Sequence, residues 1–358
     1  MMTRALATSV SLALCLGAFG CELLLGKNDY ELGSSDAGAV ANGDGGGTSD
    51  ALPTADAAPD AAPGSLFLQV LATGQNQPRG LALDTDRVYW ANLGDGTISF
   101  QPKTANATTP PTLVTDAAVT PRWVALDATQ IFWPSDTNGG CVKGVLKASK
   151  DLKSGPTQLA GCTDFLDRIN GFGVDGTFVY WTTHPAGTAL FAVSKEGGQL
   201  ITLASGLGGQ PDALAIAPDA VYFNNPPLQT VTRYDKAAQT VQTIAAGHAG
   251  LTAIATDGTY VYFATAANVL RTLGSTSVDA GATAEMIATG QDGPAGVAVF
   301  GDYVYFTASG ASTVNRVRKT GGAVEVIAKN QIGARAVVAD ESGVYFSRDT
   351  GEIVRLAP

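Results

Sequence analysis

The stretch 80–90, Gly-Leu-Ala-Leu-Asp-Thr-Asp-Arg-Val-Tyr-Trp, decides the fold because it is one copy of a pattern that recurs along the chain. In every copy, a short apolar run rich in small residues precedes a triplet of one β-branched and two aromatic residues. The triplets are 43, 48, 42, 40, 43 and 40 residues apart and end at Trp90, Trp133, Trp181, Phe223, Phe263, Phe306 and Phe346. A repeat of about 40 to 45 residues, filled with short strands, is typical of one blade of a β-propeller.

The two ends of the repeating region predict how the ring closes. The region opens at 67–72 with a sequence of the fourth-strand type and finishes at 353–356 with one of the third-strand type. Seven four-stranded units are therefore complete only if the first strand joins the last blade, which also removes exposed sheet edges. We predict an all-β fold over residues 65–358: one seven-bladed β-propeller of four-stranded antiparallel blades, closed by the N-terminal strand.

The composition agrees with short strands and argues against one class of partner. The chain has 358 residues, of which 45% are hydrophobic, only 15% are charged and 43 are glycine. This favours strands and turns over a helical bundle or an alternating α/β enzyme. The net charge of −10 argues against nucleic acid, because phosphate binding requires a basic surface.

The first residues have the pattern of an export signal. Arg4 precedes an apolar run over 5–19 that ends in Gly20-Cys21, and the run is too short to span a bilayer comfortably. We therefore assign residues 1–20 to a signal peptide. The residues around Cys21 resemble the lipobox of bacterial lipoproteins, which implies a lipidated Cys21 as the membrane attachment. Glu22 in place of an aspartate then favours the outer membrane, with a periplasmic or surface-facing domain. Ordinary secretion is the alternative.

Residues 21–64 form a distinct segment of Ala, Gly, Asp, Ser and Pro. The segment has too few apolar residues to build a core. We predict a disordered acidic tether that holds the folded domain away from a membrane surface.

The repeats resemble the YWTD and NHL-like group of β-propellers. The aromatic pair of each triplet begins a four-residue segment, which reads Tyr89-Trp-Ala-Asn in the first copy. The other six segments also begin with two aromatic residues, and none of the seven ends in Asp. This departure argues against a receptor-type function and leaves the seven-bladed fold as the implication. The signal, the acidic tether and the propeller together also resemble lipoproteins of myxobacteria.

One aspartate recurs in the turn between the first and second strands of a blade. It occurs in five copies, at Asp84, Asp127, Asp175, Asp257 and Asp340. Five carboxylates in one protein raise the possibility of metal binding, but their shared position in a turn favours aspartates that cap their own backbone.

Five residues before that position, each first strand begins on the face that carries the long loops. The seven blades place there Arg79, Arg122, Asn170, Asp212, Thr252, Ala295 and Arg335. Because the ring closes, Arg335, Arg79 and Arg122 should lie on neighbouring blades. Guanidinium groups in such an arc can bind a carboxylate, sulfate or phosphate. The alternative is that they pair with loop carboxylates or close the channel.

The sequence also leaves an enzyme possible. His184 and His248 map to the same loop face, and His184, Asp212 and Asn170 are candidates for a lyase or lactone hydrolase. Resembling propeller enzymes include lactonases, which hold a metal with Glu, Asn and Asp, and a streptogramin lyase with a loop-face His. This chain offers Asp212 beside Asn170 without a Glu, so we predict no metal and no cofactor.

Two cysteines lie within the longest repeat interval, the 48 residues from Trp133 to Trp181. Cys141 should lie in the loop after Trp133, and Cys162 should follow the fourth strand of the same blade. An exported chain permits disulfides, so we predict a bridge between them, with a pair of reduced thiols as the alternative.

These patterns predict an exported, lipid-anchored, non-catalytic binding module that presents its loop face to a protein, a peptide or an envelope polysaccharide. Two alternatives stay open: an enzyme acting at the channel mouth, and a structural component of the envelope.

Overall fold

The protein is described from a computed structural model. This structure describes residues 66–115, 118–137, 140–162, 168–184, 188–280 and 283–358. The predicted signal peptide, the tether and Cys21 lie outside the described residues.

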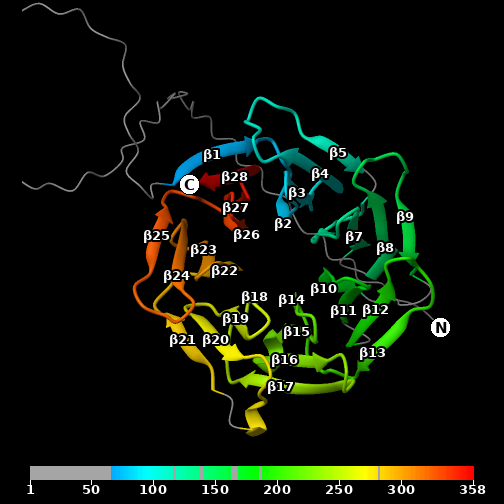
Figure 1. The fold of residues 1–358 in the computed structure, drawn as a ribbon, viewed down its shortest axis with the longest axis vertical. Coiled ribbons are helices and arrows are strands. Elements are labelled where there is room, and N and C mark those ends of the chain that lie inside the picture. Colours follow the sequence, from blue (N-terminus) through cyan, green and yellow to red (C-terminus); the bar gives the residue numbers. More distant parts are fainter. Residues whose placement is uncertain (1–65, 116–117, 138–139, 163–167, 185–187, 281–282) are drawn as a thin grey trace, which may run out of the picture. The chain divides into compact units, whose positions relative to one another are not determined.

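Seven four-stranded antiparallel sheets follow one another around a central axis, so the predicted seven-bladed β-propeller is confirmed (Figure 1). The first strand of each blade lies nearest the axis; these strands are β2 (Pro78–Leu83), β6 (Ala125–Leu126), β10 (Arg168–Val174), β14 (Leu214–Ile216), β18 (Ala253–Thr256), β22 (Pro294–Phe300) and β26 (Ala334–Asp340). The second strands are β3 (Arg87–Asn92), β7 (Gln130–Thr137), β11 (Phe178–His184), β15 (Ala220–Asn225), β19 (Tyr260–Ala264), β23 (Tyr303–Ala308) and β27 (Gly343–Arg348).

The outer half of each blade consists of a third and a fourth strand. The third strands are β4 (Thr97–Pro102), β8 (Gly140–Ser149), β12 (Ala189–Ser194), β16 (Thr230–Asp235), β20 (Val269–Leu273), β24 (Thr313–Arg318) and β28 (Glu352–Ala357). The fourth strands are β5 (Thr112–Thr115), β9 (Thr157–Ala160), β13 (Ile201–Ser205), β17 (Thr240–Ala246), β21 (Glu285–Ala288), β25 (Glu325–Ala328) and β1 (Phe67–Ala72). Two short 3₁₀ turns, η1 (Pro226–Leu228) and η2 (Val278–Ala280), complete the described elements.

The ring closes as the sequence predicts. Strand β1 pairs antiparallel with β28, and Leu68 lies opposite Leu356. Blade 7 is thus β26-β27-β28-β1, with strands from both ends of the repeating region side by side (Figure 1). The other blades are numbered 1 to 6 in chain order from β2.

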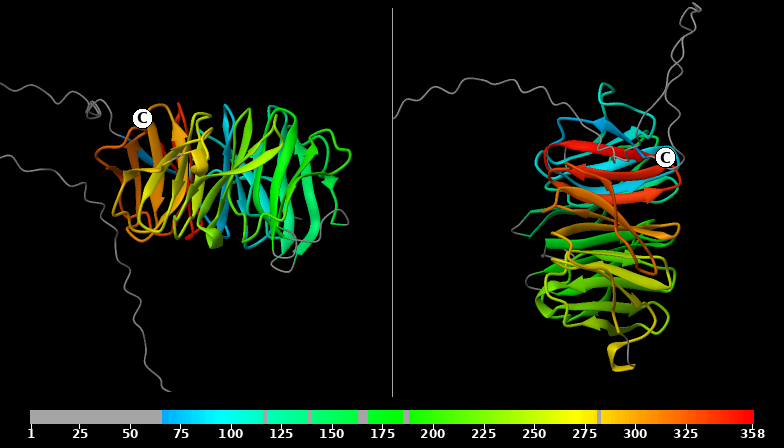
Figure 2. Two further views of the ribbon diagram at one scale, coloured as in Figure 1. Left: turned by 90° about the horizontal axis from the view of Figure 1, so that it is seen from below. Right: turned by 90° about the vertical axis from the view of Figure 1, so that its left-hand side faces the viewer.

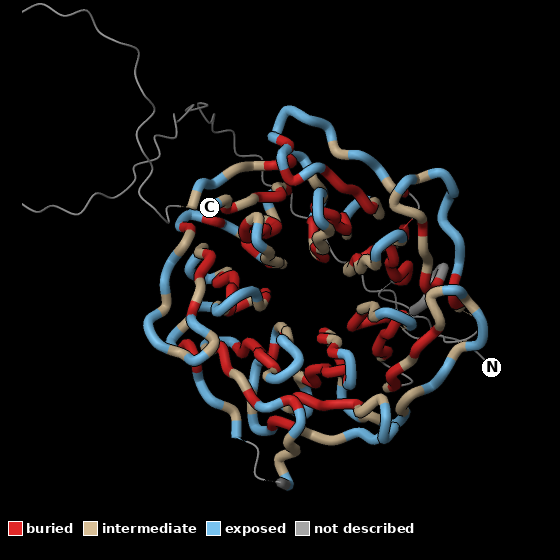
Figure 3. Tube along the Cα trace, viewed as in Figure 1, coloured by how far each residue is buried: buried red, intermediate tan, exposed pale blue. Residues whose placement is uncertain are grey.

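The aromatic triplets form the core between the blades. Val88, Tyr89 and Trp90 are completely buried, as are Trp133 and Trp181. Buried positions gather in the strands between the axis and the outer edge of the ring, whereas the outermost strands expose many residues to solvent (Figure 3). Each blade therefore stabilises its neighbours by removing apolar side chains from water. In the part of the chain that the structure describes, no helix has the length and apolar character needed to cross a membrane.

The two faces of the ring carry different connections (Figure 2). We call the side with the turns between first and second strands the turn face, and the opposite side the loop face. On the turn face, Asp175 accepts hydrogen bonds from the backbone N–H groups of Thr177 and Phe178 at 2.7 and 2.8 Å. The recurring aspartates therefore cap their own turns, which confirms that interpretation.

Each of these aspartates also binds a lysine of the next blade. The lysine follows the third strand, and Lys236 Nζ of blade 4 lies 2.8 Å from Asp175 Oδ2 of blade 3. Tyr180 Oη donates a further hydrogen bond of 2.7 Å to the same carboxylate. We call an Asp–Lys pair of this kind a clasp. The five clasps are Lys103–Asp340, Lys150–Asp84, Lys195–Asp127, Lys236–Asp175 and Lys319–Asp257.

One sequence expectation about blade 2 needs correction. Cys141 does not lie in a loop, because β7 and β8 extend into a longer hairpin in which Cys141 pairs with Asp136. The extra length of this repeat is therefore partly strand. The side chain of Cys141 lies outside the described residues, so its bridge to Cys162 stays a prediction.

Candidate functional site

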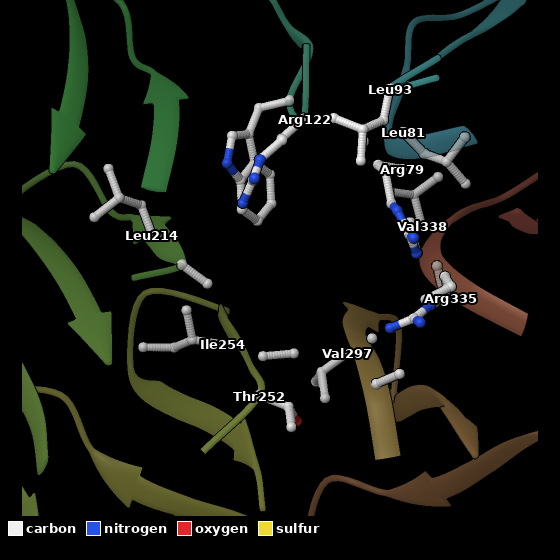
Figure 4. Close-up of a pocket in the computed structure, with 18 residues that line it drawn as sticks. Arg79, Leu81, Leu93, Arg122, Leu214, Thr252, Ile254, Val297, Arg335 and Val338 are labelled. Atoms are coloured by element: carbon white, nitrogen blue, oxygen red, sulfur yellow. The ribbon is translucent and has the colours of Figure 1, made fainter. Parts of the chain in front are cut away.

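A cavity of about 490 Å³ lies at the centre of the ring, and the first strands or the segments just before them build most of its wall. Arg79, Arg122 and Arg335 line it together, as the ring closure predicts (Figure 4). Arg79 and Arg335 occupy the loop-face ends of the first strands of blades 1 and 7, and Arg122 lies in the segment just before the first strand of blade 2. We call these three residues the arginine rim.

An apolar layer lies next to the arginine rim, further along the first strands. Two residues after the rim position, five blades contribute a branched aliphatic side chain to the cavity wall: Leu81, Leu214, Ile254, Val297 and Val337. Among the described residues that line the cavity, the arginine rim and Thr252 are the only ones with charged or hydroxyl side chains. The cavity thus combines a basic mouth with an apolar wall. Its volume lies within the range of about 300–1,000 Å³ that is typical of sites for small organic ligands.

Two arginines of the rim share one carboxylate. Arg79 Nη1 lies 2.8 Å from Asp349 Oδ1, and Arg335 Nε lies 2.8 Å from Asp349 Oδ2. Asp349 belongs to the loop between β27 and β28 of blade 7. Pairing with a loop carboxylate, the alternative that the sequence left open, is therefore what these two arginines do.

The shared carboxylate leaves the charges unequal. Burial lowers the pKa of Arg79, Asp349 opposes that shift, and Arg335 adds to it by repulsion. A guanidinium still keeps its proton at neutral pH. Two positive charges therefore face one negative charge at this contact.

Arg122, the third arginine of the rim, lies in a different electrostatic setting. Burial lowers its pKa, and Arg168 lowers it further, while Asp136 and Asp212 raise it. Arg79 also lowers this pKa, so the two rim arginines affect each other across the mouth.

Trp123, next to Arg122, breaks the repeat. The other six blades have glycine or alanine at this position: Gly80, Gly171, Ala213, Ala253, Gly296 and Ala336. Space is narrow there, since a Cβ at Gly80 would come within 2.7 Å of Trp123 Cα. Trp123 lines the cavity, packs against apolar clusters of blades 2 to 5, and donates from Nε1 to the carbonyl of Asn170 at 2.6 Å. An aromatic wall therefore stands beside the arginine rim.

A second group of charged residues lies on blades 2 to 4. Asp136 is 1% exposed and accepts a hydrogen bond of 2.6 Å from the backbone N–H of Ile169. Burial raises its pKa to about 6, although Arg122 and Arg168 act in the opposite direction. Burial likewise raises the pKa of Asp212, against the effects of Arg168, Arg122 and His184.

The structure separates the other predicted site residues from the cavity wall. Asn170 is buried and donates from Nδ2 to the carbonyl of Pro211 at 3.3 Å, so its amide faces blade 4. Asp212 and His184 are half-buried near each other, but neither lines the cavity. His248 contacts the ring of Phe263 edge-on, and burial lowers its pKa. Within the described ranges, no three side chains of His, Cys, Asp or Glu gather closely enough to share a metal ion.

Sequence reasoning missed Trp123, Asp349, Asp136 and Arg168. Trp123 had a visible signal, because it is the single large residue at a repeat position of glycine and alanine. Asp349 had no such signal in the sequence, since its pairing with Arg79 and Arg335 depends on how the loop between β27 and β28 folds. Asp136 and Arg168 depend in the same way on the contact between blades 2 and 3.

Comparison with known proteins gives the fold and leaves the function open. No protein-family model matches the chain, and no curated protein sequence does. A catalytically inactive virginiamycin B lyase from Staphylococcus aureus, solved with quinupristin, has 15% identity and a TM-score of 0.66, covering 82% of this chain and 100% of its own.

Two further solved structures are similar. A streptogramin B lyase has 13% identity and a TM-score of 0.66, and the match covers 81% of this chain and 97% of that one. The computationally designed protein Ika8 has 15% identity and a TM-score of 0.55, with 81% of this chain and 100% of that one covered. At such identities the likeness establishes the propeller fold alone, because this fold carries many unrelated functions.

Proposed function

We propose that this protein is an exported, lipid-anchored binding module without catalytic activity, and that its partner docks at the loop face by inserting an anionic group into the central cavity. The observation that carries this proposal is the arginine rim at the mouth of an apolar-walled cavity. Arg79 and Arg335 share the single carboxylate of Asp349, so a second anion would balance the charge there.

The anchor is part of the same proposal. Cys21 would carry the lipid after removal of residues 1–20, and residues 21–64 would connect it to the propeller. The domain would then sit in the cell envelope at the outer membrane, facing the periplasm or the cell surface. Labelled palmitate should be incorporated into the full chain in a bacterial host and not into a Cys21→Ser variant. Export of both forms without label would instead indicate ordinary secretion.

Binding at the rim is tested with the exported full chain carrying Cys21→Ser, which removes the predicted lipid attachment. The probes are inorganic sulfate, an acidic tetrapeptide and an oligogalacturonate, so that a bare ion, a peptide and a polysaccharide are compared. Specific binding raises the thermal midpoint by mass action. We expect a shift that disappears in the Arg79→Ala, Arg335→Ala double variant and persists in Arg318→Ala. Arg318 is an exposed arginine at the far end of β24 and serves as the control. If no probe shifts the midpoint, the proposal is wrong.

An enzyme acting at the channel mouth is the second proposal. It is supported by the proximity of Asp212 and His184, since His184 acts on the pKa of a carboxylate that burial raises. A carboxyl group whose pKa burial raises, beside a histidine, is suited to acid–base chemistry in a lyase or lactone hydrolase. Turnover of a lactone or cyclic depsipeptide that is lost in both His184→Ala and Asp212→Asn would favour this function. A purely structural envelope component, in contrast, would tolerate loop-face substitutions without any change of cell phenotype.

A disulfide between Cys141 and Cys162 completes the proposal for an exported chain. It would join the β7–β8 hairpin to the segment that follows β9 in the same blade. Peptide mapping by mass spectrometry, with and without reduction, should detect one cross-linked peptide that contains both residues. Full alkylation of both thiols without reduction would contradict the bridge.

A further inference from the structure

We propose that the group bound in the central cavity is a carboxylate carried directly on an aromatic or similarly bulky apolar body. This inference rests on the proposed function and specifies which chemistry the site selects. The carboxylate would bind at the arginine rim, and the apolar body would enter the layer below it.

The geometry at Asp349 indicates which anion fits. Its two oxygens bridge Arg79 and Arg335, one oxygen to each guanidinium at 2.8 Å. Each guanidinium has five N–H donors, and this bridge uses one nitrogen of each. The remaining nitrogens can bind a second carboxylate in the same way. Repulsion from Asp349 would place that second carboxylate on the side of Arg122, across the mouth.

The wall below the rim indicates what the rest of the ligand must be. Leu81, Ile254 and Val297 offer only carbon surface at this depth. A sulfate ion or a sugar acid would leave this layer in contact with water, whereas an apolar body would remove it from water at about 25 cal/mol per Å². The cavity therefore favours an amphipathic acid over a fully polar anion.

Trp123 makes a flat aromatic body the best match. The indole lines the cavity at the one repeat position where other blades have only glycine or alanine. Aromatic rings pack favourably against each other in offset or edge-to-face arrangements. A departure from an otherwise regular repeat is also expected at functional positions, because packing alone would select a small residue there.

The same chemistry can come from two sources. One is a small aromatic acid, and the other is the C-terminal residue of a peptide that ends in phenylalanine. In the second case the preceding residues would leave through the loop face. Both present a carboxylate next to an aromatic ring, so the experiment includes one arm for each.

The first arm uses isothermal titration of the exported full chain carrying Cys21→Ser. The probes are 3-phenylpropionate, its uncharged amide and inorganic sulfate. We expect the acid to bind at least about tenfold more tightly than the amide and more tightly than sulfate. The peptide arm compares Ala-Ala-Phe with its C-terminal amide. A preference for the free peptide carboxylate alone would identify a peptide end as the source, and a preference confined to phenylpropionate would identify a small acid.

Variants divide the site into its two parts. Arg335→Gln should weaken binding of the acid at least about fivefold and leave the amide unchanged. Trp123→Leu should weaken binding of the acid and leave sulfate unchanged. Should Trp123→Leu fail to fold, Val297→Thr tests the same layer with a side chain of equal shape. Arg318→Gln, at the far end of β24, is the matched control and should change neither affinity.

The outcomes separate this inference from the proposed function. Equal affinities for acid and amide, or unchanged binding of the acid in both Trp123→Leu and Val297→Thr, would overturn the inference. If sulfate binds and depends on Arg335 while the acid binds no better, the arginine rim is a general anion site. In that case the proposed function stands and only the inference fails. If no probe binds, both are wrong.

Discussion

The two faces of the propeller use the same kinds of charge in different ways. On the turn face, five lysines meet five aspartates, one pair at each of five blade junctions. On the loop face, Arg79 and Arg335 share the single carboxylate of Asp349. Each clasp on the turn face matches one cation with one anion, whereas at this contact the mouth of the cavity holds two cations for one anion.

Departures from the repeat have a different meaning on the two faces. The clasps are regular, and where one member is missing its partner is missing too. Ala217 replaces the aspartate between blades 4 and 5, and Gly274 replaces the lysine. Between blades 6 and 7, Phe300 and Pro358 stand at the two positions. Such joint loss is expected of pairs that hold blades together. At the rim position, in contrast, the residue type differs between blades without such pairing. This is expected of a site that recognises a molecule outside the chain.

The largest effect should come from removing a clasp. Asp175→Ala deletes two backbone caps, the hydrogen bond from Tyr180 and the ion pair with Lys236. Because four interactions of one carboxylate are lost together, we expect the free energy of unfolding to fall by about 2–4 kcal/mol. Urea denaturation measures it. Replacing the exposed Glu196 by alanine is the control and should change stability by less than about 0.5 kcal/mol. Equal effects of the two substitutions would show that the clasps do not stabilise the ring.

The pH dependence of stability should have opposite signs on the two faces. Burial would raise the pKa of Asp175, but hydrogen bonds from Lys236, the backbone and Tyr180 outweigh it and hold this pKa at about 2. Because the pKa of an unfolded aspartate is about 3.9, the stability from Asp175 is present above that pH and lost as pH falls through about 2. Burial raises the pKa of Asp136 to about 6. Its contribution is therefore full below about 3.9 and lost as pH rises through about 6.

Denaturation at several pH values separates these two contributions. Asp136→Asn should lessen the decline of stability between pH 5 and 7, relative to the parent chain. Asp175→Asn should lessen the decline below pH 4 and leave the region near pH 6 unchanged. If Asp136→Asn has the same profile as the parent between pH 5 and 7, then Asp136 does not titrate there and the contrast between the faces is wrong.

The same contrast explains what the sequence could predict. The spacing of the aromatic triplets predicted seven blades, because every blade must bury the same kind of side chain against the next. It also predicted the ring closure and the capping role of Asp84 and its equivalents. The clasp lysines escaped notice, since hairpins of unequal length place them 13 residues after Trp90 but 17 after Trp133.

The candidate site was predictable only in part. The arc of Arg79, Arg122 and Arg335 followed from repeat register and ring closure, which needs no side-chain geometry. The separation of Asn170 from this arc did not follow, because it depends on its amide turning toward the carbonyl of Pro211. Register gives the position of a residue in a blade, but packing decides whether its side chain faces the channel or the neighbouring blade.

A smaller effect should follow from changing the charge ratio at the mouth. Asp349→Asn removes the negative charge between Arg79 and Arg335 and keeps an acceptor oxygen beside them. We expect sulfate to bind about three to ten times more tightly, because it no longer competes with a fixed carboxylate. Stability should change by less than about 1 kcal/mol, since both arginines are partly exposed. Titration calorimetry with Glu352→Gln as the control measures this, and weaker binding in Asp349→Asn would mean that the carboxylate organises the rim instead of occupying it.

The smallest effect should come from adding a clasp where the ring lacks one. Between blades 6 and 7, Tyr305 lies five residues after Phe300, the same offset that separates Tyr180 from Asp175. Pro358 follows β28 as Lys236 follows β16. Phe300→Asp and Pro358→Lys together should therefore form a sixth ion pair with a coupling energy of about 0.5–1 kcal/mol, as for other partly exposed pairs.

A double-mutant cycle isolates that coupling from the cost of losing the Phe300 side chain. The junction between blades 4 and 5 is the matched control, because a Cβ at Gly274 would collide with the hydroxyl of Tyr222. Ala217→Asp with Gly274→Lys should accordingly destabilise the ring. Favourable coupling between blades 6 and 7 and loss of stability between blades 4 and 5 would show that backbone space, and not charge alone, decides where the turn face can be clasped. If no coupling is measured between blades 6 and 7, a clasp can form only at junctions whose turns already fit it.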